Sequence, residues 1–229
     1  DSPGWLSAAA TWGDVNSYPA DGTACDDGDP NTTGDVYTNG ICQGTQSNSP
    51  PTLNSVIITP STAYESTSLS CTASGVSDID GDTVTLSYMW EVNSIQTSTS
   101  NTLNGASFNK DDMVSCTITP NDGTQDGAPV TSNSITIQNS LPVVSGLTFD
   151  STSSGIFTHT THNCLFSVSD VDGDAVTTIV RWYADGVLIG TGPTITLTSS
   201  LISVGQNLQC EVTPNDGTAD GQTVITPIN

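Results

Sequence analysis

The chain has 229 residues, of which two are basic and 24 acidic, and its formal net charge is −22. With Lys110 and Arg181 as its only basic residues it cannot neutralise a phosphate backbone, which excludes nucleic-acid binding. No run approaches the about 20 apolar residues that span a bilayer, so we expect no membrane span. Three of the acidic residues are glutamates and 21 are aspartates, and aspartate is typical of turns and of oxygen-ligand metal loops.

Composition also indicates fold class and compartment. Thr, Val, Ile and Ser dominate the later chain, which predicts an all-β fold. The chain begins at Asp1 without a methionine, which we interpret as a processed end and therefore as export. Six cysteines without a C-x-x-C pair favour disulfides in an oxidising space over zinc; the alternative is free buried thiols.

The later chain contains two copies of one pattern. The motif S-D-x-D-G-D occurs at residues 77–82 and 169–174, and T-P-N-D-G-T occurs at 119–124 and 213–218. Cysteines and tryptophans also match between the copies, as the pairs Cys71 and Cys164, Trp90 and Trp182, and Cys116 and Cys210. A pattern kept in register over this length indicates an internal duplication. We therefore expect an N-terminal arm at 1–24, a cysteine-rich loop module at 25–48, a first repeat at 50–139 and a second repeat at 141–229.

Each repeat has the strand spacing of a β-sandwich. In the first repeat the expected strands are 55–59, 68–73, 83–92, 113–119 and 134–138, separated by clusters of Asn, Asp, Gly and Pro. The order Cys, Trp, Cys fits a disulfide between the two sheets of an Ig-like sandwich, with the tryptophan packed on it. The duplication then selects three pairs: Cys71–Cys116, Cys164–Cys210 and, by remainder, Cys25–Cys42.

The combined motif C…SDxDGD…W…C-x-[IV]-TPNDGT-x-DG resembles the Ig-like repeats found in tandem on large bacterial and archaeal surface proteins. That resemblance implies a surface location and a structural or adhesive role, without a defined ligand. Residues 25–42 similarly resemble short cysteine-rich C-D-D-G-D-P modules of secreted proteins. They depart from those modules where Asn31 and Tyr37 replace inner cysteines, so we expect one disulfide there.

Aspartates supply the main chemistry. In an Ig-like sandwich the loop that carries S-D-x-D-G-D and the loop that carries N-D-G-x-x-D-G lie at the same end, so distant carboxylates meet. Their mutual repulsion costs several kcal/mol without a cation, and Ca²⁺ accepts many oxygen ligands in irregular loops. The predicted Ca²⁺ ligands are Asp78, Asp80, Asp82, Asp122, Asp126, Asp170, Asp172, Asp174, Asp216 and Asp220. The alternative is a solvated acidic turn at each place.

The same end of each repeat faces whatever precedes it in the chain, so bound calcium is expected to fix the angle between neighbours and produce a rod. A further candidate calcium loop in the cysteine-rich module has the oxygen ligands Asp27, Asp29, Asn31 and Asp35. Its alternative is a surface loop held by the disulfide. Asn31 also begins an N-x-[ST] sequence, which is a glycosylation acceptor if the host exports glycans this way.

We expect no enzyme activity. His159 and His162 lie in an expected strand and are predicted to be exposed residues rather than a metal pair. The acidic residues lie on polar turns without an evident aromatic cleft, so a glycosidase-like arrangement is not favoured.

The two ends predict contacts with other copies. Aligned on Gly127 and Gly221, the second repeat stops near the equivalent of Ile135, so its last strand is expected to be short and its edge open to a strand from a neighbour. The arm forms one apolar face either as a strand, through Leu6 and Trp12, or as a helix, through Trp5 and Trp12; it alternatively packs on the first repeat. The predicted polymer contacts are Trp5, Leu6, Trp12, Val224, Ile225 and Ile228.

These features together predict a secreted, calcium-stiffened subunit of an extracellular filament. The filament is expected to be a pilus-like homopolymer in which the subunits assemble head to tail. The alternative is a monomeric module of a larger surface protein that acts in cell adhesion by binding surface glycans or cells.

Overall fold

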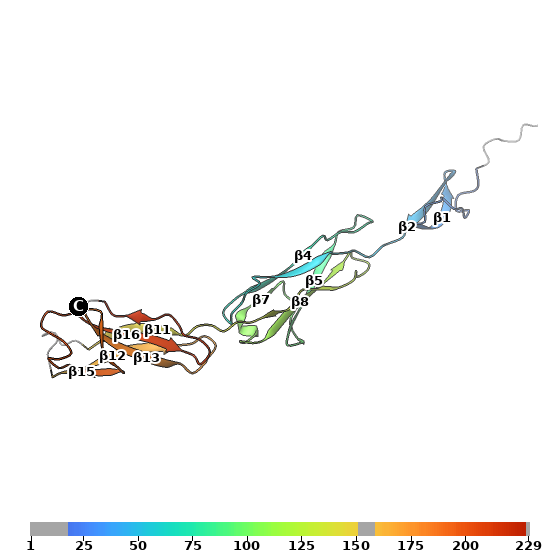
Figure 1. Ribbon diagram of the computed structural model, residues 1–229. Helices are drawn as coiled ribbons and strands as arrows, with labels where there is room; N and C mark the ends of the chain where they lie inside the picture. Colours follow the sequence, from blue (N-terminus) through green and yellow to red (C-terminus); the bar gives the residue numbers. More distant parts are fainter. Residues whose placement is uncertain (1–17, 151–158, 228–229) are drawn as a thin grey trace, which may run out of the picture.

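The computed structural model describes residues 18–150 and 159–227, which form 17 strands and one 3-10 turn and contain no α-helix. Four of the predicted polymer contacts lie outside these residues, namely Trp5, Leu6, Trp12 and Ile228. A hairpin and two sandwiches follow one another as an extended row (Figure 1). Within the described ranges no helix is long and apolar enough to cross a membrane.

The cysteine-rich module is an antiparallel hairpin of β1 (Thr32–Thr38) and β2 (Ile41–Gln46). Asn39 and Gly40 form its two-residue turn, and both have positive φ, at 51° and 80°. A turn with two such residues matches the twist of a hairpin, which explains the Asn-Gly sequence. The Cys25–Cys42 disulfide ties the preceding loop to β2.

The first repeat is a sandwich of two sheets. One sheet has the order β3 (Ser55–Thr59), β4 (Leu69–Ser74), β7 (Thr102–Leu103). The other has the order β10 (Ile135–Thr136), β8 (Met113–Asn121), β5 (Thr85–Val92), β6 (Ile95–Ser98), with β9 (Val130–Thr131) also paired to β8. The 3-10 turn Gly105–Ser107 follows β7.

The second repeat has the same architecture. Its first sheet is β11 (Val143–Phe149), β12 (Thr161–Ser169), β15 (Thr194–Thr196). Its second sheet is β14 (Val187–Thr191), β13 (Thr177–Ala184), β16 (Leu208–Asn215), β17 (Val224–Ile225).

A disulfide and a tryptophan form the centre of each core. In the first repeat Cys71 of β4 is bonded to Cys116 of β8 across the two sheets, and Trp90 is fully buried with its indole N–H donating to the Ser100 carbonyl (2.9 Å). The second repeat pairs Cys164 with Cys210, and Trp182 donates to the Gly192 carbonyl (3.0 Å). The all-β fold with two tandem Ig-like sandwiches and a disulfide-bonded N-terminal module is therefore confirmed.

Candidate functional site: the acidic ends of the two sandwiches

Two acidic loops lie together at the end of the first repeat that faces the hairpin; we name loops 77–82 and 121–127 the first acidic pole. The linker that follows β2 contacts both of them. The backbone N–H of Ser49 donates to Asp80 Oδ2 (2.6 Å), and the side-chain amide of Asn48 donates to Asp122 Oδ2 (2.9 Å). Because both partners come from adjacent linker residues, the predicted meeting of these two loops is confirmed.

The second repeat reproduces this arrangement at its own linker. We name loops 169–174 and 215–221 the second acidic pole. The N–H of Ser140 donates to Asp172 Oδ2 (2.6 Å), and the amide of Asn139 donates to Asp216 Oδ2 (2.8 Å). An Asn-Ser pair thus connects each linker to the repeat that follows it, and we call the two connections the first joint and the second joint.

The joint aspartates are held as carboxylates. The other oxygen of Asp216 accepts the backbone N–H groups of Thr218 and Ala219 (both 2.7 Å). The Asn139 amide and these N–H groups favour the charged form, so the pKa of Asp216 lies below its ordinary value. Asp122 has the same surroundings, and the N–H of Gln125 together with the Asn48 amide lowers its pKa. Both side chains are therefore ionised at neutral pH.

The last aspartate of each N-D-G-x-x-D-G run closes its own loop. Asp126 Oδ1 accepts the side-chain amide of Asn121 (2.7 Å), and Asp220 Oδ1 accepts that of Asn215 (2.7 Å). This pairing, together with the capping of Asp122 and Asp216, accounts for the motif as loop and linker chemistry. Their role as calcium ligands stays a prediction.

Three aspartates of the second pole form a compact group. Asp170, Asp172 and Asp174 each offer one oxygen, and these oxygens lie within 4.8 Å of one another. Asp170 Oδ2 and Asp172 Oδ1 are buried and have no hydrogen-bond partner among the described residues. Buried carboxylate oxygens without a donor are costly, and a hard cation is the partner that satisfies several of them at once.

The first pole is more open. Its S-D-x-D-G-D aspartates, Asp78, Asp80 and Asp82, do not form so tight a group within the described ranges. Asp78 Oδ2 is nevertheless buried without a donor there, and a cavity of about 210 Å³ lies between Asp80, Asp82 and the linker. Gln46 borders this cavity and donates its side-chain amide to Asp80 Oδ1 (2.8 Å).

The hairpin places its acidic residues differently from the predicted set. The group within 4.8 Å is Asp26, Asp27 and Asp35. Asp29 instead accepts the backbone and side-chain N–H groups of Asn31 (2.9 and 3.1 Å), so these two residues bond to each other. Asp27 accepts the N–H of Asp29 (2.9 Å), which contributes most to lowering its pKa, while Asp35 Oδ1 is buried without a donor in this part of the chain.

The described part of the second repeat, up to residue 227, contains no counterpart of β10. In the first repeat β10 covers one end of β8, with Ile135 paired to Val114. The equivalent end of β16, at Leu208, pairs with β13, and within residues 18–150 and 159–227 no strand takes the place of β10. Of the predicted contacts, Ile225 is half-exposed at this edge.

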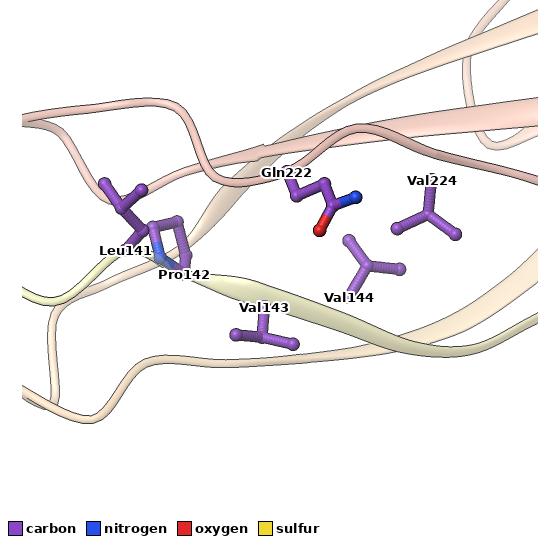
Figure 2. A pocket seen from close by; sticks show the side chains of 6 residues that line it. All are labelled: Leu141, Pro142, Val143, Val144, Gln222 and Val224. Atoms are coloured by element: carbon purple, nitrogen blue, oxygen red, sulfur yellow. The ribbon is translucent and has the colours of Figure 1, made fainter.

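A groove of about 280 Å³ lies where β11 and β17 face each other. Figure 2 shows Val144, Gln222 and Val224 in the space between the two segments, with Leu141 and Pro142 at one end. Leu141 and Val143 remain half-exposed beside it. The groove continues the apolar core of the sandwich to the surface.

The expectation of two exposed strand histidines holds only in part, because His159 is exposed but outside a strand and His162 is in a strand but buried. His159 lies in a turn with φ at 68°, outside β12. His162 is buried, its Nδ1 lies 2.9 Å from the Asp150 carbonyl, and its ring packs edge-on against Phe149. His162 thus belongs to the core of the second repeat.

Sequence reasoning missed the linker residues as members of the site. A signal was present, because Asn48-Ser49-Pro50-Pro51 and Asn139-Ser140-Leu141-Pro142 share the pattern N-S-x-P before each repeat. It missed Lys110 as well, whose partner Asp174 lies in the other repeat.

No protein-family model matches the chain, and no curated protein matches it. Similar solved structures include three N-terminal domains of the highly immunogenic outer capsid protein of bacteriophage RB49 (16% identity, 77% of this chain and 58% of that one, TM-score 0.34). A calcium-stabilised, ice-binding adhesin of an Antarctic bacterium is similar at 18% identity, 77% and 48% coverage and TM-score 0.31. Chicken CNTN1 FN1–FN3 domains are similar at 9% identity, 82% and 67% coverage and TM-score 0.31. This chain thus spans about half the length of the first two structures.

Proposed function

We propose that the protein is a secreted structural subunit of an extracellular filament, in which Ca²⁺ stiffens the joints between modules. The observation that carries the proposal is the position of the acidic poles. Each pole lies at a joint and binds the linker that enters it, so a cation held there acts on the angle between neighbours. The three disulfides support a place in an oxidising, extracellular space.

Charge and unsatisfied oxygens support calcium as the cation. The chain carries a net charge of −22, and its carboxylates are concentrated in the loops of the hairpin and the poles. Buried oxygens without donors occur on Asp78, Asp170, Asp172 and Asp35, hence in all three modules of the described chain. Oxygen-only ligands on irregular loops suit Ca²⁺ better than Mg²⁺, which demands octahedral geometry, or Zn²⁺, which is typically bound through nitrogen and sulfur.

Head-to-tail assembly requires a strand from another copy to pair with β16, and the described residues up to 227 place no strand at the position that β10 takes on β8. The first repeat illustrates what completes such a sandwich, because Ile135 of β10 pairs with β8 and Ile137 is fully buried. We infer that a strand from the arm of another copy takes this position on β16. Leu6 and Trp12, on one face of that strand, would contact the core, and Val224 and Ile225 would border it. Contacts of this kind do not close and therefore produce a filament.

Electron microscopy of the purified chain tests the assembly. We expect fibres with an axial repeat of one subunit, and we expect deletion of residues 1–18 to abolish them. In the strand arrangement Leu6→Asp places a charge on the buried face and prevents fibres, whereas the matched control Ser7→Asp, on the opposite face, leaves them intact.

The other outcomes are also informative. Fibres that persist after the deletion would show that the arm is not the connector. Dispersed particles from the unaltered chain would contradict the filament and favour a monomeric adhesin. Fibres lost with Trp5→Asp but kept with Leu6→Asp would indicate a helical arm.

A further inference from the structure

One lysine connects both repeats and the linker between them. The backbone N–H of Lys110, in the turn before β8, donates to Glu65 Oε1 within the first repeat (2.8 Å). Its ammonium donates to Asp174 Oδ2 in the second repeat and to Asn139 Oδ1 in the linker (3.2 Å). The side chains of Lys110 and Asp174 are only 21% and 29% exposed, so this ion pair is partly shielded from water.

The first joint has no equivalent charge among its described residues. There the donors to the acidic pole are all uncharged: the Gln46 amide and the Ser49 N–H on Asp80, and the Asn48 amide on Asp122. Lys110 is also not a feature of the repeat itself, because the register of the duplication places Val204 at its position in the second repeat, and Val204 is fully exposed. The lysine therefore belongs specifically to the second joint.

The second acidic pole concentrates negative charge beside Lys110. Asp170, Asp172 and Asp174 lie within 4.8 Å, and two of their buried oxygens have no donor there. Lysine is protonated at neutral pH, so the Lys110 side chain brings a positive charge into contact with Asp174. A single ammonium offsets part of the repulsion among the three carboxylates, and it does so while bonded to both neighbouring modules.

We propose that Lys110 is the built-in cation of the second joint and occupies, at Asp174, the place that a divalent cation would otherwise take. The second joint then stays fixed in the absence of metal, whereas the first joint, where Gln46 donates to Asp80 without bringing a charge, depends on metal. The part that concerns metal rests on the proposed calcium function; the part that concerns Lys110 as a lock does not.

Single-molecule energy transfer across the second joint tests this directly. Dyes are attached through non-natural amino acids at the exposed positions Thr99 and Ser199 of the full chain, one in each repeat. We compare the unaltered chain with Lys110→Met, which keeps the length of the side chain and removes its charge. The matched control is Arg181→Met, because Arg181 pairs with Glu211 on the sheet surface (3.2 Å), away from the joint.

In EDTA we expect one narrow distance distribution for the unaltered chain and for Arg181→Met, and a distribution at least about twice as wide for Lys110→Met. Addition of CaCl₂ is expected to restore the narrow distribution of Lys110→Met. Lys110→Met is also expected to bind calcium about tenfold more tightly than the unaltered chain at one site, measured by calorimetry, because a competing positive charge is removed.

Three results would overturn the proposal. A narrow distribution for Lys110→Met in EDTA would show that the lysine does not lock the joint. A wide distribution for Lys110→Met that calcium fails to narrow would show that the lysine does not occupy the position of a metal ion. Calcium binding by the unaltered chain would then still support the proposed function, whereas no calcium binding would contradict the proposed function as well. An intact mass lower than the calculated mass by one ammonia would also overturn it. That loss would show that Lys110 Nζ has attacked Asn139 Cγ and formed an amide bond, so that the joint is held covalently and not by an ion pair.

Discussion

Replacing Cys164 and Cys210 together by alanine is expected to lower the free energy of unfolding of the second repeat by about 4 kcal/mol. Their bond closes a loop with a sequence separation of 46, and the entropy that such a loop removes from the unfolded chain has this size. Both residues are buried beside Trp182, so the sheets also lose a contact in the core. Scanning calorimetry measures the effect as a lower unfolding temperature of one transition.

The matched control is the Cys25–Cys42 pair, which closes a loop with a sequence separation of 17 in the hairpin. Its replacement by alanine is expected to leave the transition of the second repeat in place. An unchanged transition in the Cys164 and Cys210 double variant would contradict the assigned pairing and the core built around it.

Gly221→Ala is expected to destabilise the second repeat by about 3 kcal/mol, at the upper end for overpacking, and to loosen the second joint. A Cβ at residue 221 would lie 1.9 Å from the carbonyl oxygen of Pro142, and backbone there cannot move without moving the linker. The loop that holds Asp216 would then withdraw from Asn139. A Cβ at residue 127 would likewise lie 1.9 Å from the carbonyl oxygen of Pro51. Gly127→Ala is therefore expected to destabilise the first repeat and to loosen the first joint.

Chemical denaturation and the energy-transfer distribution across the joint measure the two effects. Gln222→Ala is the matched control, because residue 222 is exposed and adjacent. If Gly221→Ala is as stable as this control and gives an equally narrow energy-transfer distance distribution, the result would contradict the close contact between loop and linker.

Much of the fold follows from pattern. Alternating apolar residues located the strands to within a few positions, as in 55–59 for β3 and 113–119 for β8. The duplication supplied the cysteine pairs, because two copies of one fold must use matching residues. The same topology placed the loops of Asp80 and Asp122 at one end, which is a property of strand direction and needs no knowledge of side chains.

The detailed chemistry of the site did not follow from pattern. Carboxylate spacing alone does not reveal that Asp122 and Asp216 are occupied by backbone N–H groups and a linker amide, since those donors appear only when the loop closes. Lys110 is 64 residues from Asp174, and only the angle between repeats brings them together. His162 became a core residue because Phe149 and Asp150, on a different segment, surround it.

Small-angle X-ray scattering of the full chain, first in CaCl₂ and then in EDTA, tests most directly whether metal at the acidic poles holds the modules in line. We predict a narrow, extended distance distribution with calcium, a broader one after chelation as the first joint loosens, and full recovery when calcium returns. Asp82→Asn, which removes a charge beside the first-joint cavity, should abolish this response, whereas Glu91→Gln, at the opposite end of β5, should keep it. Identical scattering in calcium and in EDTA would contradict the account.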